Sequence, residues 1–104
     1  MSSSPLTRNV TVRNAQGLHA RPADMLVRLA NQFQSDLHLG KSGQWVDCKS
    51  ILSVLTLGAT QGTELSVSAT GSDAETALEA IGELFETGFD EPNEVEDAES
   101  TVDS

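Results

Sequence analysis

The chain has 104 residues, about the length of one domain, with six basic and sixteen acidic residues and a formal net charge of −10. This balance argues against nucleic acid or an anionic membrane as a general partner, because binding a phosphate backbone needs a dense positive surface. A single cysteine, Cys48, excludes an intrachain disulfide and a cysteine-based zinc cluster. The apolar runs are too short to span a membrane and the first residues lack a signal-peptide pattern, so we expect a small soluble cytoplasmic domain without membrane insertion.

The first half of the chain predicts a strand, a helix and a hairpin. Apolar residues alternate over residues 6–13, which is the period of a half-buried strand. Over residues 20–33 the apolar positions recur at helical spacing, and Pro22 falls in the first turn, where its missing N–H does little harm. Short apolar stretches at 36–39 and 44–48 then flank a glycine-rich turn, which indicates a β-hairpin.

The segment that follows the hairpin is ambiguous. Residues 50–57 are short and apolar, and periodicity alone does not separate strand from helix there. Ser50 as an N-cap and Gly58 as a stop favour a short helix. Alternation of apolar residues over 63–69 then predicts another strand.

The last helix has the clearest pattern. Ser72 and Glu75 have the spacing of a capping box, in which the serine caps the helix and the glutamate reaches back, and Gly88 is a candidate stop. The order of elements is therefore βαββαβα. Half-apolar strands favour an antiparallel sheet with one face exposed to water, and the amphipathic helices would cover the other face. We predict an α+β fold, an open-faced sandwich with a four-stranded antiparallel sheet covered on one face by three helices.

The acidity is concentrated at the end of the chain. Residues 90–104 contain seven acidic residues and no basic residue, and their only branched aliphatic residues are two valines. Such a segment cannot bury enough apolar area to offset its chain entropy. We therefore expect a domain over residues 1–89 and a disordered acidic tail over 90–104, which is either a solvating appendage, the reading we favour, or a docking segment.

One segment could carry chemistry, at residues 17–23. Gly17 permits an unusual turn, and His19 falls where the loop becomes the predicted helix. The free N–H groups and the dipole of the first helical turn favour an anion there, and Arg21 adds a fork-shaped cation suited to phosphate. The same dipole favours a neutral imidazole, whose free nitrogen is a nucleophile able to take up a phosphoryl group. A structural histidine that caps the helix is the alternative, and the chemistry alone leaves both open.

The sequence Gly-Leu-His-Ala-Arg-Pro-Ala at residues 17–23 resembles the active-site signature of the HPr family, the histidine-containing phosphocarriers of the bacterial phosphotransferase system. Residues 49–58 resemble the regulatory-serine segment of the same family, and Thr-Gln-Gly-Thr at 60–63 also fits. The resemblance covers about residues 6–89 and implies the βαββαβα fold.

The resemblance also implies roles for individual residues. His19 would be phosphorylated on Nδ1 by Enzyme I, which is charged from phosphoenolpyruvate, and would pass the group to an Enzyme II A-type domain. Arg21 matches the arginine that interacts with the phosphate. Ser50 matches the serine that an ATP-dependent HPr kinase/phosphorylase phosphorylates in many members. Such a protein is a stoichiometric carrier rather than a turnover enzyme, and we expect a monomer without cofactor or metal.

A docking surface is implied as well. The residues that match it come from the two first helices and the residue before Ser50: Met25, Arg28, Lys49, Ile51, Leu52 and Leu55. Asp24 departs from the family pattern, since it adds negative charge near the phosphate and should oppose an acidic partner. Two alternative functions stay open, a regulatory binding module controlled by phosphorylation of Ser50 and a nitrogen-type branch of the relay. Intact His19 and Arg21 favour the carrier.

Three further side chains predict no chemistry. His38 lies on a predicted strand without a cluster of ligands around it, so we interpret it as structural. Cys48 alternates with Val46 and is expected to behave as a small hydrophobic residue in the core. Trp45 falls on the opposite face of the strand and should be partly exposed.

Overall fold

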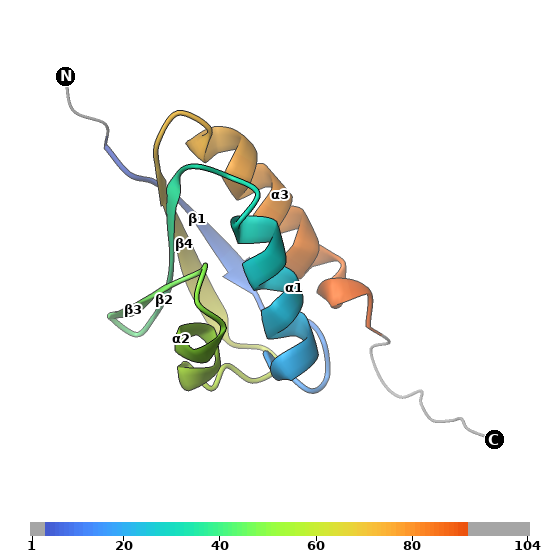
Figure 1. Ribbon diagram of the computed structural model, residues 1–104. Helices are drawn as coiled ribbons and strands as arrows, with labels where there is room; N and C mark the ends of the chain where they lie inside the picture. Colours follow the sequence, from blue (N-terminus) through green and yellow to red (C-terminus); the bar gives the residue numbers. More distant parts are fainter. Residues whose placement is uncertain (1–3, 92–104) are drawn as a thin grey trace.

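The computed structural model describes residues 4–91, which form a four-stranded antiparallel sheet with helices on one face (Figure 1). The sheet order is β1-β4-β2-β3, and the helices α1, α2 and α3 are followed by one 3-10 turn, η1. The elements in chain order are β1 (Leu6–Thr11), α1 (Ala20–Ala30), β2 (Asp36–Lys41), β3 (Gln44–Asp47), α2 (Ile51–Thr56), β4 (Glu64–Thr70), α3 (Ala74–Glu86) and η1 (Gly88–Asp90). The predicted open-faced sandwich and its element order are confirmed.

The central strand β4 shows why one face of the sheet is buried. Its alternate residues Leu65, Val67 and Ala69 are almost fully buried, while the serines between them lie on the open face. In the register, Leu65 lies opposite Val10 of β1 and Val67 lies opposite Leu39 of β2. Apolar residues of three strands therefore meet on the face that the helices cover, and this layer is the core.

The ambiguous apolar segment is a helix, as predicted. Ser50 is the N-cap of α2, and its hydroxyl accepts a hydrogen bond from the backbone N–H of Ser53 at 3.4 Å. Gly58 follows the helix with a φ of 58°, which suits a stop. The first helix, α1, is shorter than the predicted 20–33, because the chain leaves the helix after Ala30.

The capping box predicted for α3 is wrong. Asp73, not Ser72, is the N-cap residue, and no side chain caps the helix there. The Asp73 carboxylate instead accepts hydrogen bonds from the N–H groups of Gln34 and Ser35, both at 2.9 Å, and from the Ser35 hydroxyl. Because these bonds join the start of α3 to the α1–β2 connection, a long-range contact replaces the expected local one.

The chain turns sharply where α3 ends. Gly88, Phe89 and Asp90 all have a φ between 58° and 65°, in the left-handed region that residues other than glycine rarely adopt. The turn confirms the stop at Gly88 and places Phe89 fully inside the core, edge-on to Phe85 with ring centroids 4.9 Å apart. It brings Glu91 back toward the start of α1. The rest of the predicted acidic tail, residues 92–104, lies outside the described residues.

Candidate functional site

The loop between β1 and α1 is held against the loop that precedes β4. Gly17 has a φ of 73°, and a Cβ atom there would lie 2.4 Å from the carbonyl oxygen of Ala59. The next residue, Leu18, donates its N–H to that same oxygen at 2.9 Å and buries its side chain. Only glycine allows this close approach, so the first residue of the predicted motif fixes where His19 emerges.

His19 is the N-cap residue of α1. Its backbone is extended, with φ −81° and ψ −169°, and its carbonyl accepts the N–H of Ala23 at 3.0 Å. The imidazole makes no capping hydrogen bond, so the alternative of a capping histidine is not supported by the geometry. The ring is instead partly exposed, next to a helical end whose first N–H groups have no intrahelical partner.

The imidazole and Arg21 share an anionic partner, the side chain of Glu91. One carboxylate oxygen, Oε2, lies 3.0 Å from His19 Nε2 and 3.1 Å from Arg21 Nη1. The other oxygen, Oε1, lies 3.3 Å from His19 Nε2. The Glu91 side chain is only 13% exposed, whereas that of Arg21 is 56% exposed. The start of α1 thus already has a carboxylate beside the two residues that the motif predicts to bind phosphate.

Asn14 joins the loop to this carboxylate. Its side chain is fully buried, and its Nδ2 donates to the carbonyl of Gly17 at 2.7 Å and to Glu91 Oε1 at 3.1 Å. Neither residue is predicted from the sequence to belong to the site, because Asn14 has the pattern of an ordinary strand breaker and Glu91 is one of many acidic residues near it. Their contact spans 77 positions in the chain, and no spacing rule reaches that far.

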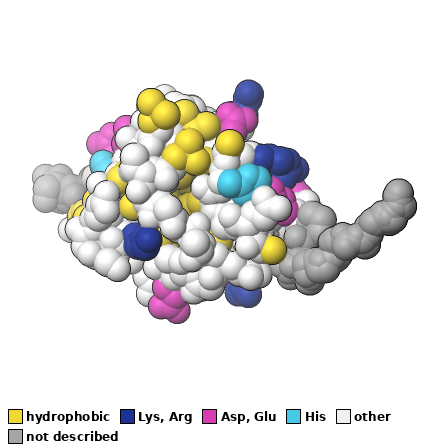
Figure 2. All heavy atoms as spheres, turned by 90° about the horizontal axis from the view of Figure 1, so that it is seen from below, with side chains coloured by type: hydrophobic (Ala, Val, Ile, Leu, Met, Phe, Trp, Pro, Cys, Tyr) yellow, Lys and Arg dark blue, Asp and Glu magenta, His cyan; other side chains and the backbone are white. Residues whose placement is uncertain are grey.

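The predicted docking residues lie together on α1, on α2 and between β3 and α2. Leu52 is 73% exposed, while Met25, Ile51 and Leu55 are half-buried. Two of the predicted cations are engaged within the domain: Arg28 Nε donates to Asp24 at 2.8 Å, and Lys49 Nζ donates to the Phe33 carbonyl at 2.8 Å. Seen from the end of the molecule that carries α2, hydrophobic side chains gather on the surface near a histidine (Figure 2).

Ser50 stands beside that surface. It is half-buried at the start of α2, and its hydroxyl is occupied as the helix cap described above. His19 and Ser50 thus begin two different helices, α1 and α2.

The remaining side chains lie as follows. His38 is exposed on β2, Trp45 is half exposed on β3, and Cys48 is completely buried, which confirms it as a core residue. Burial raises the pKa of the Cys48 thiol to about 12, with a smaller contribution from the negative charge of Asp47.

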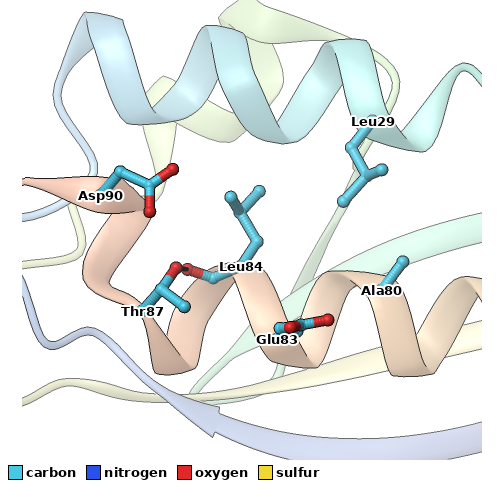
Figure 3. Close-up of a pocket in the computed structure, with 6 residues that line it drawn as sticks. All are labelled: Leu29, Ala80, Glu83, Leu84, Thr87 and Asp90. Atoms are coloured by element: carbon cyan, nitrogen blue, oxygen red, sulfur yellow. Dashed lines mark hydrogen bonds between the residues drawn. The ribbon is translucent and has the colours of Figure 1, made fainter.

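Other kinds of site find little support in the described part of the chain. Within residues 4–91, no group of three or more histidine, cysteine or acidic side chains is placed to hold a metal ion. Among the same residues, no helix has the length and apolar character needed to cross a bilayer. A shallow groove of about 350 Å³ opens between α1 and α3 (Figure 3). It contains none of the predicted site residues; the residues that line it are Leu29, Ala80, Glu83, Leu84, Thr87 and Asp90.

Comparison with known proteins shows the family of the chain. Residues 6–87 match the family model described as "PTS HPr component phosphorylation site". The chain is 44% identical over 86 residues to phosphocarrier protein HPr of Xylella fastidiosa strain Temecula1, an alignment that covers 83% of this chain and 97% of the relative. It is 41% identical to phosphocarrier protein NPr of Proteus mirabilis, covering 81% and 94% of the two chains.

A solved structure agrees as well. The crystal structure of HPr-C-His from Thermoanaerobacter tengcongensis superposes with a TM-score of 0.81 at 37% identity, covering 84% of this chain and 98% of the other. Sequence and structure match over nearly the whole described domain. The chain therefore belongs to the HPr family, the phosphocarrier proteins of the phosphotransferase system.

Proposed function

We propose that His19 is the phosphoryl carrier of this protein, accepting the group on Nδ1 from Enzyme I and passing it to an Enzyme II A-type domain. One observation supports this above the others: the imidazole of His19, unused as a cap, stands with Arg21 at the first turn of α1 and already contacts an anion there. Arg21 and the N–H groups of this turn that lack an intrahelical partner offer the charge and the hydrogen-bond donors that a phosphoryl group needs.

The proposed transfer needs no cofactor. The lone pair of His19 Nδ1 forms a bond to phosphorus, while the bond between phosphorus and the donor's histidine breaks and its electron pair stays on the donor nitrogen. The phosphoryl oxygens would meet the backbone N–H groups of Ala20 and Arg21 and the Arg21 guanidinium. Onward transfer is the same step in reverse, with the Enzyme II A-type histidine as the nucleophile.

The test of the carrier role compares the two histidines of the chain. The purified protein is incubated with phosphoenolpyruvate and Enzyme I, and its intact mass is measured. We expect a gain of one phosphate that is labile to acid, abolished in His19→Ala and retained in His38→Ala, because His38 lies exposed on β2 away from α1. If His19→Ala still gained the acid-labile phosphate, the acceptor would be another residue.

The two partners are proposed to dock on the apolar surface beside the site. The exposed Leu52 supports this, since a large apolar side chain left in water at the start of a helix is typical of an interaction surface. Ser50 is proposed as the serine that an HPr kinase/phosphorylase modifies. Its place next to Leu52 supports a simple form of control, in which the added phosphate disturbs docking by its charge.

A further inference from the structure

The Glu91 carboxylate contacts one ring nitrogen of His19, Nε2, and not the nitrogen that we propose as the phosphoryl acceptor. We propose that Glu91 is a positioning residue for phosphoryl transfer: it holds the proton of His19 on Nε2 and so keeps the lone pair of Nδ1 free for phosphorus. This inference rests on the proposed carrier function and adds to it a residue outside the stretch 6–87 that the family model matches.

The choice of nitrogen follows from what a carboxylate can do. An ionised carboxylate only accepts hydrogen bonds, and both oxygens of Glu91 lie within 3.3 Å of Nε2. Nε2 must therefore donate, and a neutral imidazole with its proton on Nε2 has its lone pair on Nδ1. The same arrangement of a carboxylate behind a histidine fixes the tautomer and orientation of the ring in serine hydrolases.

The carboxylate also matches the charge that develops during transfer. A neutral ring that gains a phosphoryl group on Nδ1 while keeping its proton on Nε2 carries a formal positive charge. Glu91 places a negative charge against that proton, with Oε2 at 3.0 Å from Nε2 and a side chain only 13% exposed to water. An ion pair of this kind stabilises the phosphorylated ring more than the neutral one, which favours acceptance of the group.

Glu91 does not need to leave for a phosphate to enter. The two nitrogens of an imidazole point in divergent directions, so a group on Nε2 leaves the approach to Nδ1 open. Among residues 4–91, Arg21 is engaged through Nη1, which lies 3.1 Å from Glu91 and 3.4 Å from the Phe89 carbonyl, and a guanidinium has five N–H donors in all. The remaining donors of Arg21 are free to turn to a phosphoryl group.

The carboxylate is built into the fold rather than left loose at the surface. The turn at Gly88–Asp90 is anchored by the fully buried ring of Phe89, two residues before Glu91. Asn14 then holds the carboxylate from the other side, at 3.1 Å, through a side chain that is itself fully buried. Donors from three residues, Asn14, His19 and Arg21, thus converge on one carboxylate.

The experiment compares Glu91→Gln with Glu86→Gln in the full chain. Glu86 is a matched control, because its substitution removes the same charge on α3, and within the described part of the chain Glu86 pairs with the exposed Arg13 alone, at 3.4 Å. The first readout is the nitrogen-15 NMR spectrum of the His19 ring in the isolated protein, at a pH where the ring is neutral. The second is the rate of His19 phosphorylation by phosphorylated Enzyme I. Glu91→Ala is included in case the amide of Glu91→Gln disturbs folding.

We expect one protonated Nε2 and one unprotonated Nδ1 in the wild type and in Glu86→Gln. In Glu91→Gln the two nitrogen signals should move toward each other as both tautomers become populated, and phosphorylation should slow on the order of tenfold, the worth of one hydrogen bond to a charged group. An unchanged ring spectrum with an unchanged rate would overturn the proposal, and so would a faster rate, which would make Glu91 a competitor of the phosphate. A wild type that Enzyme I does not phosphorylate would refute the carrier function instead, while the ring spectrum would still decide the role of Glu91.

Discussion

At position 48 a thiol occupies a place in the core that an aliphatic side chain could fill. Cys48 is completely buried, and its backbone N–H donates to the Leu37 carbonyl at 2.9 Å. The raised pKa, about 12 against an ordinary value of 9.0, means that the native protein resists ionisation of this thiol. The unfolded chain ionises it more readily, so alkaline pH favours unfolding.

We therefore predict that the free energy of unfolding falls as the pH rises from 9 toward 12. The contribution of Cys48 is fully present below pH 9.0 and is lost through this window, with a slope of up to about 1.4 kcal/mol per pH unit. Urea unfolding of the wild type and of Cys48→Ala across this range measures it. The variant should be less stable at pH 8 because of the cavity, yet show the flatter dependence. Parallel pH curves for the two proteins would contradict the prediction.

The site shows how far single residues can be predicted from the sequence. Gly17, His19 and Arg21 follow from a local motif, and local chemistry is what a motif records. Asn14 and Glu91 meet only because the turn after α3 returns the chain to the β1–α1 loop. That turn is made by Phe89 and Asp90 with positive φ, a conformation for which glycine would be the expected residue. No local pattern indicates it.

Among the elements, the start of α3 carries an unusual carboxylate. Asp73 accepts hydrogen bonds from the Ser35 hydroxyl and from two backbone N–H groups, and these bonds hold the pKa of the carboxyl below its usual value of 3.8. The bonds favour the ionised form in the native state and have no counterpart in the unfolded chain. They join α3 to the connection between α1 and β2.

We predict that this junction weakens under acid. Because the native pKa of Asp73 is lowered, its contribution to the free energy of unfolding is present above pH 3.8 and is lost as the pH falls through the native value. Asp73→Asn should flatten the decline in thermal stability below pH 4, and the same substitution at the exposed Asp36 should not. Calorimetric melting temperatures between pH 2 and pH 6 measure the effect. Equal pH dependence in wild type and Asp73→Asn would show that the bonds contribute nothing.

The N-caps of α2 and α3 show when a helix cap can be predicted from the sequence. Ser50 is predicted correctly because its hydroxyl accepts from the N–H group three residues on, within the same helix. The capping box at Ser72 and Glu75 fails although its spacing is right. Asp73, which lies between them, is the N-cap residue of α3 instead. Its carboxylate accepts hydrogen bonds from Gln34 and Ser35, which are distant in the sequence. Local rules hold where no distant donor competes.

At the scale of the whole molecule, the proposed carrier role and the proposed docking surface can be tested together through one modification, that of Ser50. Phosphorylation of Ser50 would add charge at the start of α2, next to the exposed Leu52. We predict that Ser50→Asp, which imitates this charge and remains a good N-cap, lowers kcat/KM for phosphorylation by Enzyme I on the order of tenfold through docking. The melting temperature should change little.

Ser42→Asp is the matched control for this prediction. Ser42 lies exposed in the β2–β3 turn with a φ of 51°, a conformation that aspartate tolerates, so the same charge is added outside α2 and its N-cap. Steady-state kinetics with Enzyme I compares the two variants. Equal loss in both would indicate an effect of net charge, and no loss in Ser50→Asp would remove the regulatory role.

The overall architecture was predictable because most of its elements show the period of a strand or a helix in the sequence. Alternation at β1 and β4 and helical spacing at α1 and α3 each say which residues face the core. Periodicity does not say which strands are neighbours. The order β1-β4-β2-β3 places the last strand between the first and the second, and it is pairings such as Leu6 with Ala69 and Asp36 with Thr70 that establish it.

The turn after α3 has a practical consequence for anyone who labels or immobilises this protein. Glu91 lies against His19, so a fusion made directly after Glu91 would begin beside the imidazole. Leu6 pairs with Ala69 at one end of the sheet, whereas Thr11, the last residue of β1, pairs with Glu64 and leads into the His19 loop. Six strand residues, roughly 17 Å or more, separate the two ends. An affinity tag or surface linkage therefore belongs at the amino end, where partners still have access to the imidazole.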